Sequence, residues 1–132
     1  PLYPGTGLVS DRGCGNVLNI PVSPGATSKD YYQAVDEILI PELQHFRPEI
    51  IMVSAGFDAH TLDPLANVEL QDTDYGWITR RLTELAANYC DNRLVSVLEG
   101  GYNLDALADS AATHVMALMD VSGSVDESLL TV

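Results

Sequence analysis

The sequence predicts an α/β domain in which helices alternate with the strands of a mostly parallel sheet. Two short apolar runs, residues 50–55 and 93–98, contain several β-branched side chains, and each lies just before a glycine. Around them, apolar side chains recur at the three- and four-residue spacing of helices that are buried on one side. Strands and helices that alternate along a chain form parallel sheets with helical crossovers, so we expect a three-layer αβα architecture.

The first third of the chain contains a predicted loop, a strand and a helix. Residues 1–15 are rich in proline and glycine and should form a loop. Residues 17–22 should form a short strand, and a helix should begin near Ser28, whose hydroxyl can cap the first turn. The expected inward positions of this helix are Tyr32, Val35, Ile38, Leu39, Leu43 and Phe46. Pro41 should kink or split the helix, and Pro48 should end it.

The rest of the chain repeats this alternation. The 50–55 strand is apolar enough to be buried on both faces. Asp72 or Thr73 can cap a helix that runs to about Cys90, and its expected buried stripe is Trp77, Ile78, Leu82, Leu85 and Tyr89. After the 93–98 strand, a last helix should cover 104–119, with Leu104, Leu107, Ala111, Val115 and Leu118 inward. Residues 1–122 therefore form one domain, and residues 123–132 form a tail that we expect to fray.

Composition limits the classes of partner. A chain of 132 residues suffices for one domain with a modest core. Its 19 acidic and 6 basic residues give a formal net charge of −13, which argues against nucleic acid or an anionic membrane as a partner and favours cationic ones. No apolar run is long enough to span a membrane. Cys14 and Cys90 stand alone in the sequence, which is typical of a reduced, cytoplasmic protein.

A polar motif follows the first strand. Residues 54–65 read Ser-Ala-Gly-Phe-Asp-Ala-His-Thr-Leu-Asp-Pro-Leu. Asp58 comes just after the strand's carboxyl end, where ligands sit in α/β sheets. A carboxylate at such a place either holds a metal, a base or a positive charge, or it caps a helix or braces a loop. Position alone favours the cap or brace.

Four ordered motifs change this balance. They are Pro4–Gly7, Asn19–Pro21, residues 54–65, and the segment Leu98–Asn103, which reads Leu-Glu-Gly-Gly-Tyr-Asn. Together they closely resemble the zinc-dependent histone deacetylases and the related acetylpolyamine amidohydrolases, over roughly residues 1–119. Phe57, His60 and Glu99 make the resemblance closer to class II and bacterial members. The resemblance implies a partial arginase/deacetylase-like fold.

The same resemblance implies roles for individual residues. Asp58 matches the family's last zinc ligand, and Tyr102 matches the catalytic tyrosine whose hydroxyl donates to the developing oxyanion. It places substrate contacts at Tyr3, Leu65, Gly100 and Gly101. Tyr3 would be a wall of the acyl-lysine channel and Leu65 its rim, which favours a peptide-type acyl-lysine substrate over an acylated polyamine. Both side chains have packing as an alternative role.

Most of the family's metal site is absent from this sequence. The Asp-x-His strand and the pair of adjacent histidines have no counterpart, and one carboxylate cannot hold Zn²⁺ tightly. Asp58-Ala59-His60 is a formal replacement for the Asp-x-His pattern, but a loop hydrogen bond is the favoured role of His60. His45 and His114 are expected to be surface or structural histidines.

Three functional hypotheses remain open. The first is the C-terminal portion of a zinc-dependent deacetylase, with an upstream segment that supplies the missing ligands and with acetylated lysine or polyamine as substrate. The second is a truncated, non-catalytic module for oligomerisation or binding, and the third is a remnant without a selected activity. The retained Asp58 and Tyr102 favour descent from an active enzyme, whereas the absent ligands predict that the chain is inactive alone. Apolar strand edges left open predict a homo-oligomer.

Overall fold

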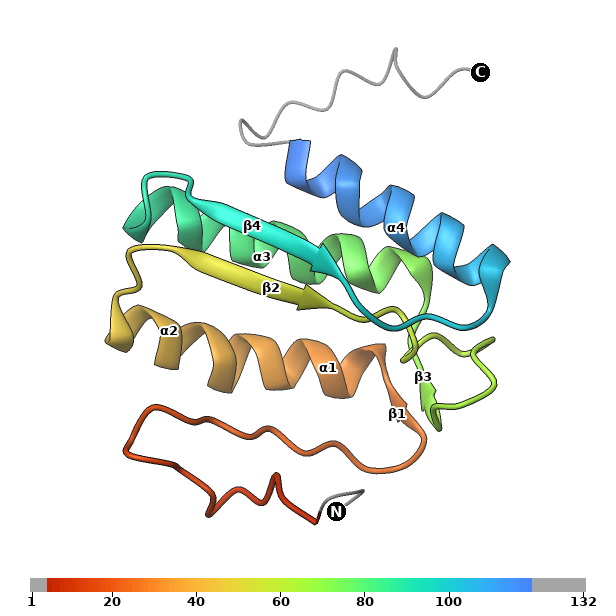
Figure 1. Ribbon diagram of the computed structural model, residues 1–132, viewed down its shortest axis with the longest axis horizontal. Coiled ribbons are helices and arrows are strands. Elements are labelled where there is room, and N and C mark those ends of the chain that lie inside the picture. The colour runs from red at the N-terminus through yellow and green to blue at the C-terminus, as the bar shows by residue number, and fades with distance from the viewer. Residues whose placement is uncertain (1–4, 120–132) are drawn as a thin grey trace.

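The computed structural model describes residues 5–119, which form the predicted α/β arrangement with parallel strands (Figure 1). The strands are β1 (Ala26–Thr27), β2 (Ile51–Ala55), β3 (Val68–Glu69) and β4 (Leu94–Leu98). The helical elements are α1 (Ser28–Ala34), the π-helical turn η1 (Val35–Leu39), α2 (Ile40–Phe46), α3 (Asp72–Tyr89) and α4 (Leu104–Met119). β2 pairs with β4 and β1 pairs with β3, both in parallel. Tyr3, the boundary at residue 122 and the tail 123–132 lie outside the described residues.

The strand predicted over residues 17–22 does not form, and this prediction was wrong. Within the described part of the chain no strand lies beside this segment, so its backbone has no ladder to join. The side-chain amide of Asn19 instead donates hydrogen bonds to the carbonyls of Leu8, at 2.9 Å, and Asp11, at 3.0 Å. These bonds close the segment into a loop.

The first helix begins where the sequence predicts, but with another cap. The carboxylate of Asp30 accepts hydrogen bonds from the Thr27 amide, at 2.8 Å, and from the Thr27 hydroxyl, at 2.9 Å. Thr27 and Asp30 therefore hold the first turn. The Ser28 hydroxyl, predicted to be the cap, donates to the carboxylate of Asp74 at the start of α3, at 2.7 Å.

Pro41 splits the first helix, as predicted, and the split changes which residues are buried. Proline lacks an amide hydrogen, and its ring crowds the preceding turn. The chain widens there into η1, in which the amide of Ile40 donates to the carbonyl of Val35, and α2 begins at Ile40. The wider turn rotates the helix face, so Ile40 is buried while the predicted inward residues Ile38 and Phe46 are 42% and 73% exposed.

The helices cover one face of the β2–β4 pair among residues 5–119. Ile51 and Leu94 pack against apolar side chains of the helices. On the opposite face Met52, Val95 and Val97 are 73%, 47% and 53% exposed. β4 passes in front of α3 in Figure 1, which places that helix behind this strand. The prediction that the 50–55 strand is buried on both faces is therefore wrong for this chain.

α4 has the predicted bounds but packs through smaller side chains than predicted. Its buried residues are Ala106, Ser110, His114 and Ala117. Leu104 and Val115, predicted inward, are 77% and 49% exposed. Small side chains let α4 approach α3 closely, and a Cβ at Gly76 of α3 would lie 2.5 Å from the Thr113 side chain of α4. Close helix approach thus overrides the larger apolar stripe.

A buried carboxylate joins α1 to α3. Asp74 is 2% exposed and accepts hydrogen bonds from the Ser28 hydroxyl, the Gln71 amide at 2.7 Å, and the Tyr32 hydroxyl. Burial, together with the hydrogen bond to Asp74, raises the pKa of Tyr32 to about 12. The Tyr32 ring also packs on Trp77, with ring centroids 4.1 Å apart. One side chain therefore satisfies donors from both helices.

A buried histidine links α4 to β4 and α3. The ring nitrogens of His114 lie 2.6 Å from the Thr79 hydroxyl and 2.8 Å from the Ser96 hydroxyl. The Thr79 hydroxyl donates to the Tyr75 carbonyl, at 2.6 Å, so it accepts from Nδ1–H, and Nε2 accepts from Ser96. Burial lowers the pKa of His114. This confirms the prediction of a structural histidine.

Removing the Asp74 carboxylate should destabilise the fold strongly. Asp74→Ala would leave the part-buried donors of Ser28, Gln71 and Tyr32 without this acceptor, and we expect the free energy of unfolding in urea to fall by about 3 kcal/mol. Asp72→Ala, in the same helical turn, is the matched control and should cost less than about 1 kcal/mol. Equal effects of the two substitutions would contradict this role for Asp74.

Neutral His114 should make stability fall as pH decreases. Its folded-state pKa lies below the ordinary value of 6.5, so the unfolded chain binds the proton first. Stability is then complete above the unfolded pKa and is lost as pH falls toward the folded one. We expect the urea midpoint to drop between pH 7.5 and pH 5.5, and to drop less in His114→Gln. His45→Gln, on the surface of α2, should leave the pH dependence of the parent unchanged; identical profiles for all three proteins would refute the assignment.

Candidate functional site

Two loops meet at the carboxyl ends of β2 and β4. The loop after β2 covers residues 56–65, and the loop after β4 covers residues 99–103. The Glu99 amide donates to the Ala55 carbonyl, at 2.9 Å, and the Phe57 amide donates to the Gly100 carbonyl, at 2.8 Å. The parallel ladder thus continues past the strands and holds the loops side by side. This edge is where open α/β sheets bind ligands.

The carboxylate of Asp58 lies between the two loops. A Cβ built on Gly100 would come within 2.6 Å of Asp58 Oδ2, and one on Gly56 within 3.0 Å of Oδ1. Within residues 5–119 no donor hydrogen-bonds this carboxylate. Asp58 therefore neither caps a helix nor braces a loop there, and its oxygens keep their capacity to accept.

The two glycines of the second loop are required for different reasons. Gly101 has φ +135°, which side chains rarely adopt, and its Cβ would lie 2.9 Å from Leu107. Gly100 has an ordinary φ, so its lack of a side chain serves the Asp58 carboxylate. Their predicted contact with substrate stays a prediction; the structure shows that Gly100 leaves room for Asp58.

Two tyrosines from the helices lie near the Asp58 loop. The Tyr75 hydroxyl donates to the Phe57 carbonyl, at 3.1 Å. Burial, and secondarily the negative charge of Asp58, raises the pKa of Tyr31, and burial together with nearby acidic groups raises that of Tyr75. Both phenols therefore stay protonated at neutral pH. Sequence reasoning did not find these two residues as neighbours of Asp58, because no local motif marks them.

Tyr102 and Leu65 display their side chains on the surface of these loops. Tyr102 is 57% exposed and Leu65 is 71% exposed. Beneath them lies the buried carboxylate of Asp63, which accepts hydrogen bonds from the Leu65 amide, at 2.9 Å, and the Tyr102 amide, at 2.8 Å. Burial raises the pKa of the Asp63 carboxyl, but these amide hydrogen bonds outweigh it and hold the pKa below its ordinary value. The sequence motif contains Asp63, yet it was given no role in the prediction.

The histidine near Asp58 is occupied within its own loop. His60 is 5% exposed, and its Nδ1 accepts a hydrogen bond from the Leu62 amide, at 3.1 Å. This confirms the favoured loop role over a replacement Asp-x-His. Among residues 5–119 no group of three His, Cys, Asp or Glu side chains is placed to hold one metal ion. The described residues therefore do not fit a complete zinc site, and Asp58 is a single potential ligand.

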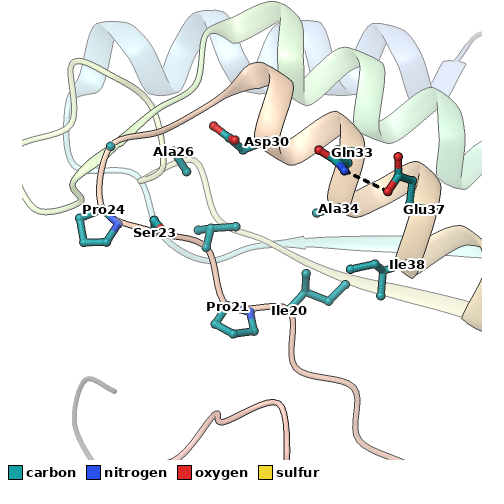
Figure 2. Close-up of a pocket in the computed structure, with 12 residues that line it drawn as sticks. Ile20, Pro21, Ser23, Pro24, Ala26, Asp30, Gln33, Ala34, Glu37 and Ile38 are labelled. Atoms are coloured by element: carbon teal, nitrogen blue, oxygen red, sulfur yellow. Dashed lines mark hydrogen bonds between the residues drawn. The ribbon is translucent and has the colours of Figure 1, made fainter.

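A separate hollow of about 360 Å³ lies between residues 20–26 and the first helix (Figure 2). Its two acidic side chains already have partners, because Asp30 accepts from Thr27 and Glu37 accepts from Gln33 at 3.0 Å. None of its lining residues belongs to the 56–65 or 99–103 loops. The hollow thus lies apart from the candidate site.

The fold and site define an α/β protein with a carboxylate and a tyrosine on loops at the ligand-binding edge of its parallel strands. Residues 1–118 match the family model described as "Histone deacetylase domain". The chain therefore belongs to the histone deacetylase domain family, as the motifs indicated. No helix among the described residues is both long and apolar enough to cross a membrane.

Individual relatives agree with this assignment. "Histone deacetylase 14, chloroplastic" of Arabidopsis thaliana is 43% identical over 121 residues, which cover 89% of this chain and 29% of the relative. "Probable deacetylase" of Archaeoglobus fulgidus is 38% identical over 123 residues, which cover 90% of this chain and 34% of the relative. The structure titled "Crystal Structure of HDA15 HD domain" superposes with a TM-score of 0.80 at 32% identity, over 97% of this chain and 36% of that one. The chain thus spans about a third of these relatives or less.

The contact between Gly100 and Asp58 can be tested by a double-mutant cycle. Gly100→Ala should lower the free energy of unfolding by about 1–3 kcal/mol, because its Cβ overlaps the Asp58 carboxylate. In an Asp58→Ala background the cost should fall by more than half, and the cycle cancels the effect of alanine on the unfolded chain. Gly56→Ala, where the overlap is smaller, is the graded control. Additive costs of Gly100→Ala and Asp58→Ala would show that the two residues do not interact.

Proposed function

We propose that this chain supplies one metal ligand and the oxyanion donor of a zinc-dependent deacetylase site. Asp58 would be the ligand and the Tyr102 hydroxyl the donor. The observation that carries the proposal is the packing of the Asp58 carboxylate on Gly100, which ties the loop of Asp58 to the loop of Tyr102 while the carboxylate has no donor within the described residues. Asp58 is half-buried, so its carboxylate oxygens remain available to a ligand.

The reaction would be hydrolysis of an acyl-lysine or acyl-polyamine amide. Negative charge develops on the carbonyl oxygen as the tetrahedral intermediate forms, and a hydroxyl donor aimed at this oxygen stabilises it. The exposed side chain of Tyr102 is free to approach such an oxygen, and its main chain is anchored by Asp63. Leu65 would form the rim of the channel, and Tyr3 its wall. The unusually acidic chain, with a net charge of −13, would also attract cationic lysine-rich or polyamine substrates.

The remaining ligands would have to come from further polypeptide. Structural and catalytic zinc sites take three or four protein ligands, and Asp58 provides one. About two-thirds of the length of these relatives lies outside the part that this chain matches, which is a sufficient source for the others. We therefore expect no hydrolysis by this chain alone, and we propose a cytoplasmic location because neither cysteine is paired.

The test is zinc content, with and without the complementary part of a relative. Alone, the chain should hold far less than about one zinc per molecule. Mixed with the part of the Archaeoglobus fulgidus deacetylase that this chain does not match, it should take up about one zinc per complex, and Asp58→Ala should abolish that uptake. Tyr102→Phe should keep the zinc and lower kcat on an acetyl-lysine peptide by about 10²–10³-fold. Zinc uptake that survives Asp58→Ala would overturn the proposal.

A non-catalytic oligomerising module is the second candidate. It is favoured by the bare face of the β2–β4 pair, where Met52, Val95 and Val97 are exposed. Covering this face with a second copy would bury apolar area without any metal. Light scattering on the zinc-free chain distinguishes the candidates: a homogeneous dimer that the complementary part does not dissociate favours the module, and a homogeneous monomer argues against it.

A further inference from the structure

Asp63 connects the two loops through their main chains, at a level below the exposed side chains. Asp63 is 8% exposed, and each of its two carboxylate oxygens accepts a hydrogen bond from a different loop. Oδ1 accepts from the amide of Leu65, in the loop after β2, and Oδ2 accepts from the amide of Tyr102, in the loop after β4. Tyr102 follows Asp63 by 39 residues, so this is a tertiary contact.

A second hydrogen bond joins the same two loops. The side-chain amide of Asn103 donates to the carbonyl of Leu62, at 3.2 Å. The carbonyl oxygen of the Asn103 side chain accepts from the Ala106 amide, at 3.0 Å, in the first turn of α4. Tyr102 therefore lies between Gly101, which has a positive φ, and a residue bound to α4. Of these contacts, only the one with Asp63 holds the main chain of Tyr102 itself.

Asp63 is itself held firmly from below. Its amide donates to the carbonyl of His60, at 2.8 Å, and the ring of buried His60 accepts from the amide of Leu62. The Thr61 amide donates to the Leu70 carbonyl, at 2.8 Å, and so ties this turn to the segment before α3. The carboxylate therefore projects from a fixed turn. A fixed anchor is what a positioning residue requires.

We infer that Asp63 is a positioning residue that sets the separation of Leu65 and Tyr102, the rim and the oxyanion donor of the proposed acyl-lysine site. One carboxylate oxygen binds the main-chain amide of Leu65 and the other binds that of Tyr102. The backbone positions from which these two exposed side chains project are therefore fixed relative to each other. The inference rests on the proposed function for the identity of the substrate. The two hydrogen bonds that Asp63 accepts from the Leu65 and Tyr102 amides, which we call the Asp63 bracket, do not depend on the proposed function.

The chemistry of the side chain explains why a carboxylate stands here. An ionised carboxylate accepts hydrogen bonds at both oxygens, whereas an asparagine accepts at one and presents an NH₂ group at the other. That NH₂ group would face one of the two amides as a second donor. Bonds from main-chain amides to a carboxylate are also stronger than bonds to a neutral acceptor. Asp63→Asn should therefore break one side of the bracket, and Asp63→Ala both sides.

The experiment is amide hydrogen exchange by NMR on the 132-residue chain without substrate. In Asp63→Ala the amides of Leu65 and Tyr102 should exchange at least about tenfold faster than in the parent. In Asp63→Asn only one of them should do so, and the amides of β2 and β4 should be unchanged in both variants. Asp109→Asn, whose carboxylate makes no hydrogen bond among the described residues, should alter neither amide. Unchanged exchange at both amides in folded Asp63→Ala would overturn the inference.

Two further measurements separate a positioning role from a purely structural one. The ring signals of Tyr102 should sharpen in Asp63→Ala as the ring gains mobility, whereas those of Tyr75 should not. If Asp63→Ala does not fold, the hydrogen-bond scalar coupling between the Tyr102 amide nitrogen and Asp63 Cγ is measured in the parent, and its absence would overturn the bracket.

The substrate assignment is tested apart from the bracket. An acetyl-lysine peptide added to the zinc-loaded complex should shift the Leu65 and Tyr102 signals, and should bind at least about tenfold more weakly to the Asp63→Ala complex. No shift in the parent complex, with the exchange results intact, would refute the proposed function and leave the bracket standing. Equal affinity of both complexes would refute the role of Asp63 in positioning.

Discussion

The buried carboxylate of Asp74 is the constraint on which the rest of the structure depends. It accepts a hydrogen bond from the Gln71 amide at the start of α3, and it also accepts hydrogen bonds from the hydroxyls of Ser28 and Tyr32 in α1. A buried carboxylate is costly unless its oxygens are satisfied, so α1 and α3 can pack only in the relative position that brings these donors together. The packing of Tyr32 on Trp77 and the ion pair of Arg81 with Asp36, at 2.9 Å, continue the same seam along the two helices. The relative position of α1 and α3 is therefore determined at their N-terminal ends, where Asp74 binds Ser28 and Tyr32.

That junction also reaches the candidate site. Tyr75 follows Asp74 directly, and its hydroxyl holds the Phe57 carbonyl next to Asp58. The Phe57 amide in turn donates to the Gly100 carbonyl, so Tyr75 and Phe57 together connect α3 to both loops. In the loop after β4, Gly100 leaves room for the Asp58 carboxylate, because a side chain at position 100 would overlap it. The loop geometry is thus a consequence of how two helices meet.

Local patterns predicted the elements well and their surroundings less well. The strands at 51–55 and 94–98 and the helix Leu104–Met119 follow from hydrophobic runs and glycine positions, which are local signals. The 17–22 strand failed because a strand also needs a neighbour, which the described residues do not provide. Two predicted inward positions of the first helix, Ile38 and Phe46, are exposed because a π turn breaks the 3.6-residue period on which the prediction relied, whereas Leu39 and Leu43 pack against the core. At the site, Asp58 was marked by a motif, whereas Tyr31 and the tie from Asp63 to Tyr102 are tertiary contacts without local trace.

The loops at the ends of β2 and β4 are held by internal contacts, although one face of these strands is exposed. Met52 and Val95 are left to solvent on one side of strands whose other side is packed, yet the loops at the ends of those strands are held by contacts internal to the chain. The Asp58–Gly100 packing and the Asp63 bracket need no residue from the uncovered side. The described residues therefore hold the Asp58 carboxylate and the main chain of Tyr102 in place by contacts of their own. In the zinc site that we propose, the remaining ligands would meet an arrangement that already exists, so less of the entropic cost of ordering the site would remain.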